Sequence, residues 1–292
     1  MSKVAVVTGS NKGLGLGIVK GLCKRFDGVV YLTSRDEKRG RDAVAELNKQ
    51  GLQPKYHQLD VSDKNSVLKF KNYIEANYGG IDILVNNAAV SNSDPTGFSS
   101  YEDNEKLIHI NFGGILTMRE IIYPLVRRNG RILNISSNCG HLSNLRNQQW
   151  REKLSKEDLK LEEVQEFIEW YLESLRNGSF NTEDFVDNGT VAAYKVSKIA
   201  LNAVTRIHQK EFEAKDISIN SVHPGYIRTG MTAGYGFFNI DEAAETPLYI
   251  VLDAPQSLKG EYIWYDRKVL DWTNYEEDYY FTIRSLLEQQ VP

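Results

Sequence analysis

The stretch that decides the fold runs from residue 8 to residue 15 and reads Thr8-Gly9-Ser10-Asn11-Lys12-Gly13-Leu14-Gly15. A short β-branched run at 4–7 precedes it, and apolar residues at helical spacing follow it. The sequence therefore predicts a strand, a glycine-rich turn and a helix. Glycines allow a sharp turn, and they let a phosphate group approach the free N–H groups at the helix N-terminus. The spacing is GxxxGxG and not the more common GxGxxG, so the turn taken alone also fits a purely structural role.

Strands and helices alternate outward from this turn. Six further apolar runs are expected to form strands, namely 29–33, 56–61, 81–85, 131–135, 217–222 and 261–264. Helical patterns separate them, among them a long one at 101–126 and another at 191–212. Apolar strands separated by helices are typical of a parallel sheet that is covered on both faces. We therefore predict a doubly wound (Rossmann) α/β fold, with a mostly seven-stranded parallel sheet and helices on both faces.

One segment interrupts this alternation. Residues 144–187 are polar and helix-prone, rich in Glu, Lys and Leu, and lie between two core elements. We interpret them as a helical insertion, placed before the helix at 191–212, within a single domain that spans residues 1–292. An acidic and aromatic tail follows at about 273–292. The insertion fits a solvated surface excursion as well as a role in shaping a substrate site or blocking oligomer formation.

Composition argues against several classes of protein. The 35 Lys and Arg residues are outnumbered by 39 Asp and Glu residues, so the formal net charge is −4 and no nucleic-acid footprint is expected. The two cysteines, Cys23 and Cys139, lack the spacing of metal ligands, and isolated thiols fit a reducing compartment. We find neither a signal peptide nor a membrane span of about 18 apolar residues, so we expect a cytoplasmic protein without a membrane partner.

The residues after the second predicted strand indicate which dinucleotide the turn would bind. Arg35 stands 20 positions after Gly15, where an acidic residue would otherwise bind the ribose 2′-hydroxyl. A guanidinium pairs well with a 2′-phosphate, and Lys12 in the turn is a second cation. We therefore predict NADPH rather than NADH, although Asp36, directly after Arg35, keeps NADH open.

A tyrosine and a lysine share one face of the helix predicted at 191–212. Tyr194 and Lys198 are four residues apart, and a nearby ammonium lowers the pKa of a phenol. The phenol could then give a proton to a carbonyl oxygen while hydride arrives at the carbon. Ser137 follows the strand at 131–135, at an end that faces the ligand crevice, so it is a candidate donor to the same oxygen. Asn111 lies in the long helical pattern, where it would hold a relay water or only cap a kink.

Taken together, these motifs resemble the short-chain dehydrogenase/reductase family over nearly the whole chain. In order, the resemblance comprises the turn at 8–15, Asp60-Val61, Asn86-Asn87-Ala88-Ala89, Asn111, Ser137, Tyr194-Lys195-Val196-Ser197-Lys198, and Pro224-Gly225 followed by Thr229. The asparagine motif of this family usually ends in glycine, so Ala89 departs from the pattern. A methyl group there costs little unless the backbone needs a positive φ.

The resemblance implies a role for each of these positions. Tyr194 would be the general acid, with Lys198 lowering its pKa and binding the cofactor ribose. Ser137 would donate to the substrate oxygen, and Asn111 would hold the relay water. Asp60 would bind the adenine amino group. The positions expected around NADPH are Gly9, Ser10, Asn11, Lys12, Gly13, Leu14, Gly15, Arg35, Asp60, Val61, Asn87, Tyr194, Lys198, Pro224, Gly225, Ile227 and Thr229.

Within the family, the chain is most similar to the carbonyl reductase subgroup. The segments 9–13, 33–36 and 224–229 support this, as do the 57 positions (194 − 137) that separate Ser137 from Tyr194. Members of the subgroup carry an insertion that is thought to cover the helix face used for oligomerisation, so a monomer is expected.

The resemblance implies the NADPH-dependent reduction of small ketones, aldehydes or quinones to alcohols. An NAD(P)-dependent alcohol dehydrogenase working in the oxidative direction is an alternative, and so is a non-catalytic, cofactor-sensing protein on the same fold. Substrate contacts are expected from Ser137, Cys139, Tyr194 and Tyr226, with His141, Tyr235, Phe237 and Phe238 as further candidates for an apolar pocket. His223, directly before Pro224, is interpreted as a structural or pocket residue and not as the catalytic base.

Overall fold

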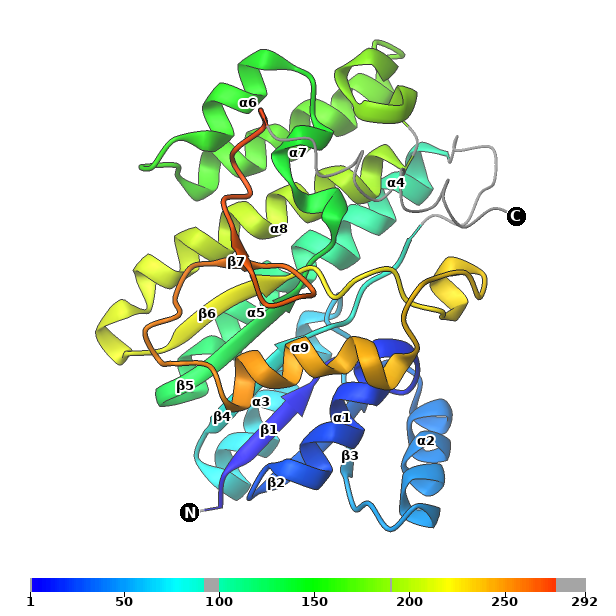
Figure 1. Cartoon of the computed structure of the whole chain (residues 1–292), viewed down its shortest axis with the longest axis vertical. Helices are drawn as coiled ribbons and strands as arrows, with labels where there is room; N and C mark the ends of the chain where they lie inside the picture. Colours follow the sequence, from blue (N-terminus) through cyan, green and yellow to red (C-terminus); the bar gives the residue numbers. More distant parts are fainter. Residues whose placement is uncertain (1, 92–99, 190, 277–292) are drawn as a thin grey trace.

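The centre of the molecule is one eight-stranded sheet (Figure 1). A computed structural model describes residues 2–91, 100–189 and 191–276. The strand order is β3-β2-β1-β4-β5-β6-β7-β8. The strands are β1 (Val4–Val7), β2 (Val29–Ser34), β3 (Lys55–Gln58), β4 (Ile81–Asn86), β5 (Val126–Ile135), β6 (Ser218–Val222), β7 (Tyr262–Ile263) and β8 (Val269–Leu270). All neighbours pair in parallel except β7 and β8, which are antiparallel.

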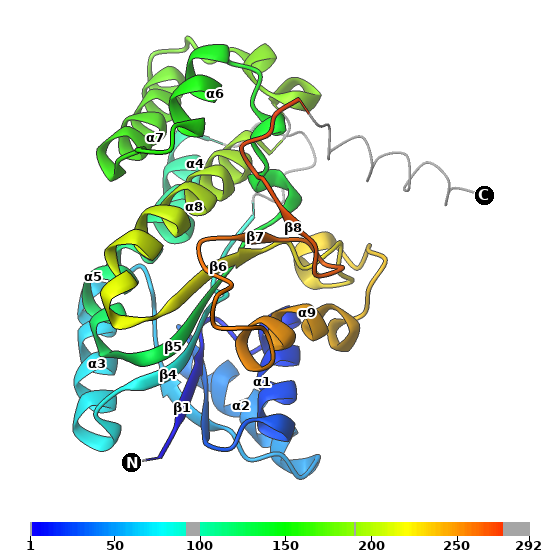
Figure 2. The same ribbon diagram turned by 60° about the vertical axis from the view of Figure 1, so that its left-hand side comes forward.

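Helices cover both faces of this sheet. In Figure 2, α1, α2 and α9 lie on one face, and α3, α5 and α8 lie on the other. The α-helices are α1 (Gly13–Arg25), α2 (Glu37–Lys49), α3 (Lys64–Tyr78), α4 (Tyr101–Ile108), α5 (Gly114–Ile121), α6 (Gln148–Ser155), α7 (Leu161–Arg176), α8 (Ala192–Glu211) and α9 (Ile240–Leu252). The predicted doubly wound α/β fold is therefore confirmed.

Strand β1 shows why this arrangement follows from the sequence. All four of its residues are fully buried. Because successive side chains of a strand point to opposite faces, Val7 packs in the same core cluster as Ile18 of α1, whereas Val6 packs with Phe70 of α3. An unbroken apolar run fits only a strand that is covered on both sides.

The strand order places the crevice of the fold. Strand β1 has β2 on one side and β4 on the other, so the direction of chain winding reverses between β1 and β4. In open parallel sheets, ligands bind outside the carboxyl ends of the strands at such a reversal. The glycine turn follows β1 and the asparagine motif follows β4, so both lie at this point.

The helical insertion consists of α6, α7 and short helical turns, and it packs on α4 and α8 at one end of the molecule (Figure 1). An aromatic cluster fills its interior, in which the Trp150 ring centre lies 5.4 Å from that of Phe167 and 5.7 Å from that of Trp170. Trp150 and Phe167 are buried together with Leu107 and Ile108 of α4 in one core cluster. The insertion is therefore packed against the domain core and is not a loose excursion.

Two predicted elements differ from the structure. The expected helix at 101–126 is wrong in its continuity, because a π-helical turn (His109–Gly113) separates α4 from α5 and the chain enters β5 at Val126. The eighth strand, β8, was not expected, because it is only two residues long and pairs antiparallel through a local turn. Of the predicted tail, residues 277–292 lie outside the described residues.

The described part of the chain contains neither a membrane-spanning helix nor a metal-binding cluster. Its helices include none that is both long and apolar enough to cross a bilayer. Its His, Cys, Asp and Glu side chains form no group of three or more that could hold a metal ion.

Candidate active site

The glycine turn needs glycine at each of its three positions. Gly9 has a φ of 59°, and a Cβ atom there would lie 2.8 Å from the Cα atom of Ala88. Gly13 has a φ of 57°, in the left-handed region that favours glycine. A Cβ atom at Gly15 would lie 2.4 Å from the side-chain nitrogen of Asn87. The turn therefore combines a left-handed backbone with close approach to the loop after β4.

Two polar side chains of the predicted site hold this turn in place. The Asn87 side-chain nitrogen donates to the Thr8 carbonyl oxygen at 2.8 Å and to that of Gly9 at 3.1 Å. The Ser10 hydroxyl is fully buried, donates to the Val7 carbonyl oxygen at 2.7 Å and accepts a backbone N–H of β2. The hydrogen bonds of both side chains therefore stabilise the backbone conformation of the turn.

The start of α1 and the end of β2 offer donors for an anion. Lys12 is the exposed N-cap residue of α1 and makes no side-chain cap, so the first N–H groups of the helix have no side-chain partner there. Arg35 is exposed after β2, and none of the ion pairs found among the described residues involves it. Asp36 instead caps α2, accepting the Arg39 N–H at 2.9 Å and pairing with its guanidinium. These residues fit a phosphorylated dinucleotide, with the two cations available and the carboxylate occupied.

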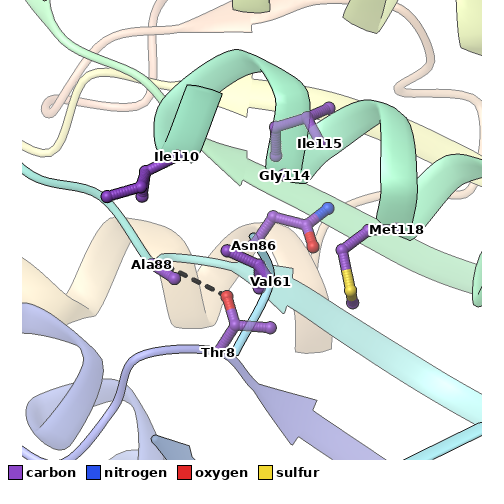
Figure 3. A pocket seen from close by; sticks show the side chains of 8 residues that line it. All are labelled: Thr8, Val61, Asn86, Ala88, Ile110, Gly114, Ile115 and Met118. Carbon is purple, nitrogen blue, oxygen red and sulfur yellow. Dashed lines mark hydrogen bonds between the residues drawn. The ribbon is translucent and has the colours of Figure 1, made fainter. Parts of the chain in front are cut away.

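An apolar pocket lies beside the loop that follows β4 (Figure 3). It is lined by Thr8, Val61, Asn86, Ala88, Ile110, Gly114, Ile115 and Met118. Val61 is buried, whereas Asp60 beside it is partly exposed and accepts two hydrogen bonds from Ser62, at 3.0 and 2.7 Å. In the turn itself, Leu14 is buried and Asn11 is partly exposed. Ala89 does not have a positive φ, so its methyl group causes no backbone strain.

Asn111 lies within the π-helical turn that separates α4 from α5. Its Oδ1 atom accepts the Val90 N–H at 2.9 Å, and its Nδ2 atom donates to the Val90 carbonyl at 2.9 Å and to the Ser197 hydroxyl at 3.2 Å. The side chain therefore ties the segment after β4 to α8. A residue at a helix irregularity was the second of the two expected roles, and the holding of a relay water stays a prediction. Single π-helical turns often occur at functional sites.

Ser137, Tyr194 and Lys198 meet at the carboxyl end of β5. The Tyr194 hydroxyl lies close enough to the side chain of Ser137 for that side chain to affect the pKa of the phenol. The Lys198 ammonium lies 5.5 Å from the centre of the Tyr194 ring and donates to the Ile135 carbonyl oxygen at 2.8 Å. Ser137 comes from the end of β5, and the other two come from the first turns of α8. Residues 57 positions apart in the chain therefore form one cluster, as the sequence analysis expects.

The ionisation of this cluster differs from the expectation. Burial raises the pKa of Tyr194, the negative charge of a neighbouring Cys139 thiolate raises it further, and the Ser137 side chain lowers it only in part. Burial also lowers the pKa of Lys198 to about 8. The pKa of Tyr194 is thus raised and not lowered in this structure, while the expected action of Lys198 on the phenol stays a prediction. The physical reason is that Tyr194 is partly buried and Lys198 is buried, and that the ammonium donates to a backbone carbonyl oxygen.

The loop after Ser137 carries two of the expected pocket residues. Cys139 is partly exposed, its N–H donates to the Ser137 hydroxyl at 3.2 Å, and burial raises the pKa of its thiol. His141 is fully buried, and its two ring nitrogens are hydrogen-bonded to Ser143 and to the Asp271 backbone. The expectation that His141 lines the substrate pocket is therefore wrong, because this ring anchors the C-terminal segment.

The loop after β6 returns to the glycine turn. The Thr229 methyl carbon lies 3.7 Å from the place of a Cβ atom at Gly13, which brings the two loops together. Gly225 has a φ of 91°, and a Cβ atom there would lie 2.6 Å from the Phe238 ring. Tyr226 is partly exposed beside this loop. The other expected residues range from buried to open, namely Pro224, Ile227, Phe237 and Tyr235, of which Tyr235 is 72% exposed.

Sequence reasoning gave no role to two buried residues beside this cluster, Lys195 and Tyr262, and only a general structural or pocket role to His223. Lys195 is 1% exposed, and its ammonium donates to the Val186 carbonyl oxygen at 2.6 Å. The Tyr262 hydroxyl donates to the Ser137 carbonyl oxygen at 2.9 Å. His223 accepts the N–H of Asn138 at 3.0 Å, which agrees with a structural role but adds a specific contact. In the sequence, only the position of His223 directly before Pro224 suggested a role near the site. Tyr262 could not be identified in the same way, because β7 is only two residues long and shows no periodic pattern.

Comparisons with known proteins support the arrangement. Residues 3–149 match the family model described as short chain dehydrogenase, and residues 177–251 match the model described as enoyl-(acyl carrier protein) reductase. Helices α6 and α7 occupy most of the interval between these matches. Carbonyl reductase [NADPH] 1 of Bos taurus is 35% identical over 280 residues, which cover 92% of this chain and 98% of the relative.

Two solved structures have the same fold. Salutaridine reductase from Papaver somniferum matches with a TM-score of 0.82 and 29% identity, covering 90% of this chain and 99% of that one. Menthone neomenthol reductase from Mentha piperita matches with a TM-score of 0.77 and 29% identity, covering 91% and 99%. The chain therefore belongs to the short-chain dehydrogenase/reductase family.

Proposed function

We propose that the protein is an NADPH-dependent reductase of small carbonyl compounds, with Tyr194 as proton donor. The observation that carries the proposal is the convergence of Ser137, Tyr194 and Lys198 at the carboxyl end of β5. The glycine turn follows β1, which is separated from β5 by β4 alone in the same sheet. The relative from Bos taurus is named as an NADPH carbonyl reductase, which agrees with this proposal.

The residues that would hold the dinucleotide are those of the turn and of the end of β2. The uncapped N–H groups of α1 suit a pyrophosphate, and Arg35 suits a 2′-phosphate. Asp36 is occupied as the cap of α2, which favours NADPH over NADH. When bound, the reduced nicotinamide supplies hydride to the carbonyl carbon.

Ser137 and Tyr194 would both contact the carbonyl oxygen of the substrate, and Lys198 would act on Tyr194. Ser137 donates a hydrogen bond to that oxygen, and Tyr194 donates a hydrogen bond and then a proton. Because burial raises its pKa, Tyr194 is protonated at neutral pH, which is the state that a proton donor requires. The ammonium of Lys198 stabilises negative charge as it develops on the phenol oxygen.

The cluster also bears on the two alternative functions, an alcohol dehydrogenase working in the oxidative direction and a non-catalytic cofactor sensor. Reduction starts from the protonated form of Tyr194, which its raised pKa provides, whereas oxidation of an alcohol would start from the phenolate. A non-catalytic cofactor sensor would have no need for Ser137, Tyr194 and Lys198 side by side at the carboxyl end of β5.

We propose small ketones, aldehydes or quinones as substrates. Cys139 and Tyr226 lie on the loops after β5 and β6 and are partly exposed, so they would contact the substrate beside Ser137 and Tyr194. An apolar thiol and an aromatic ring suit a substrate whose only polar group is its carbonyl.

We also propose that the chain acts as a monomer in the cytoplasm. Helix α7 packs along α4 and α8, which agrees with the expectation that the insertion covers the helix face used for oligomerisation. The free cysteines Cys23 and Cys139 fit a reducing compartment. Size-exclusion chromatography with light scattering would test the monomer, and a mass near twice 33.2 kDa would contradict it.

The experiment that tests the function compares the protein with its Tyr194→Phe variant. NADPH absorbance is followed with a quinone and an aromatic ketone, and NADPH affinity is measured separately by fluorescence. We expect turnover in the native protein, a loss of at least about 100-fold in the variant, and an NADPH dissociation constant within about threefold. Near-normal turnover in the variant would refute the role of Tyr194.

A further inference from the structure

The peptide bond that follows Ser137 is held at both ends by side chains that the proposed mechanism does not use. Its carbonyl oxygen, that of Ser137, accepts the Tyr262 hydroxyl at 2.9 Å. Its N–H, that of Asn138, donates to the Nδ1 atom of His223 at 3.0 Å. Because a peptide unit is planar and rigid, fixing both of its polar ends fixes the orientation of the Ser137 Cα atom that it adjoins.

His223 is built to be an acceptor at this place. It is 2% exposed, it follows β6, and its ring centre lies 4.3 Å from that of Trp264. Since Nδ1 accepts an N–H, the ring proton must be on Nε2, and that atom has no hydrogen-bond partner among the described residues. Burial lowers the pKa of His223 to about 3, so the ring is neutral and its Nδ1 lone pair stays available.

Tyr262 reaches the same peptide from the next strand. It lies in β7, is 1% exposed, and pairs in register with Ser221 of β6. Its ring contacts that of Trp264, with centres 6.1 Å apart, so one aromatic cluster supports both His223 and Tyr262.

The hydroxyl of Ser137 has local competitors for its hydrogen bonds. It accepts the Cys139 N–H at 3.2 Å and donates to the Asn138 side chain at 3.1 Å, in addition to its contact with Tyr194. A small rotation of the following peptide would therefore turn the hydroxyl toward its own loop and away from Tyr194.

We propose that His223 and Tyr262 are positioning residues, which together clamp the Ser137–Asn138 peptide so that the Ser137 hydroxyl faces Tyr194 and the substrate oxygen. The inference rests on the proposed carbonyl reduction for its kinetic consequence, whereas the clamp itself is independent of that function. Neither side chain touches the reacting atoms, so both act through Ser137.

The test uses Tyr262→Phe, which removes one hydroxyl, and His223→Leu, which removes the acceptor and keeps an apolar side chain against Trp264. His223→Asn returns an acceptor oxygen close to the place of Nδ1. Each change is made with Ser137 present and with Ser137→Ala. Turnover, KM and NADPH affinity are measured, together with hydrogen exchange at the Asn138 amide. Tyr73→Phe is the matched control, since it also removes a phenol hydroxyl from a 2.9 Å hydrogen bond, to Tyr31 at the other end of the sheet.

We expect Tyr262→Phe and His223→Leu each to lower kcat about fivefold to tenfold, with the NADPH dissociation constant unchanged within about twofold. The Asn138 amide should exchange about tenfold faster in His223→Leu. His223→Asn should recover at least half of kcat. With Ser137→Ala in place, the same changes should alter turnover less than about twofold, because the group through which they act is gone.

Three results would overturn the clamp: equal losses with and without Ser137, native kcat in Tyr262→Phe, or unchanged exchange at Asn138 in His223→Leu. If His223→Leu does not fold, Tyr262→Phe decides by the same kinetic comparison. If the native protein reduces no carbonyl compound, the proposed function fails, and the exchange of the Asn138 amide in Tyr262→Phe and His223→Asn still decides the clamp.

Discussion

Replacing Lys198 by methionine should make the protein more stable and inactive. Lys198 is 3% exposed, and burial lowers its pKa from 10.5 to about 8. That difference corresponds to about 3 kcal/mol by which folding disfavours the ammonium at neutral pH. Methionine has a similar length and no charge, but it leaves the Ile135 carbonyl oxygen without its donor, which costs about 1 kcal/mol. The net gain at pH 7 is therefore about 2 kcal/mol, or about 3 °C in Tm for a chain of this length.

The sign of the pH dependence makes the prediction specific. Below pH 8 the lysine is charged in both the folded and the unfolded chain, so the cost of burying the charge is complete. Between pH 8 and 10.5 the folded chain binds fewer protons than the unfolded chain, and native stability rises with pH. The advantage of Lys198→Met should therefore shrink from about 2 kcal/mol at pH 7 to about zero at pH 10.

Urea unfolding followed by circular dichroism at pH 7 and pH 10 is the assay. The matched control is Lys64→Met, which removes an exposed lysine paired with Glu120 and should change stability by less than about 0.5 kcal/mol. The reasoning is refuted if Lys198→Met is less stable than the native protein at pH 7, or if its advantage is the same at both pH values.

Three further predictions concern the cofactor turn and the proton chemistry. Arg35→Ala should raise the NADPH dissociation constant by about 10- to 100-fold, the worth of one charge-assisted contact, and change that of NADH by less than about twofold; equal effects in fluorescence titrations of both would contradict the assignment. Gly9→Ala should cost at least about 1–2 kcal/mol in urea unfolding, because it puts a side chain at a φ of 59° against the Ala88 backbone; a native-like midpoint would contradict this. The kcat/KM for reduction should be level from pH 6 to 7.5 and fall above about 8 as Lys198 loses its proton, while Tyr194 stays protonated; a rise toward pH 9 in initial-rate assays would show that the phenolate is the active form.

Features that depend on neighbouring residues in the chain could be predicted from the sequence. The glycine turn shows its geometry in its own spacing, because Gly9 and Gly13 have positive φ values and the strand and helix around them have clear periods. The convergence of Ser137 with Tyr194 also followed, since strand ends and helix starts of a parallel sheet meet at one edge.

Features that depend on distant packing could not be predicted. The π-helical turn at Asn111 leaves the hydrophobic period nearly unchanged, so nothing in the pattern at 101–126 marks it. The raised pKa of Tyr194 results from burial by several elements and from the position of Cys139 on another loop. The structural role of His141 could not be seen in the sequence, because its partner, the Asp271 backbone, is 130 residues further along the chain. From the sequence alone, His141 was therefore assigned to the substrate pocket.

The surroundings of Ser137 show the same limit. A histidine before Pro224 is visible in the sequence, but its partner, the Asn138 N–H, is 85 residues away and carries no side-chain signal. Tyr262 lies in a strand of two residues, too short for any periodic pattern. The residues proposed as catalytic were therefore predictable by type and spacing, whereas those proposed to orient Ser137 required the structure.

The central claim is that this chain transfers hydride to a carbonyl carbon while Tyr194 protonates the oxygen. The most direct measurement is one turnover with NADPH that carries deuterium at the transferred position of the nicotinamide, followed by mass spectrometry of the product. We predict an alcohol with a single deuterium on the carbinol carbon from the native protein, and almost none formed by Tyr194→Phe in the same time. NADPH that is bound but not consumed, or an alcohol without deuterium, would contradict the account.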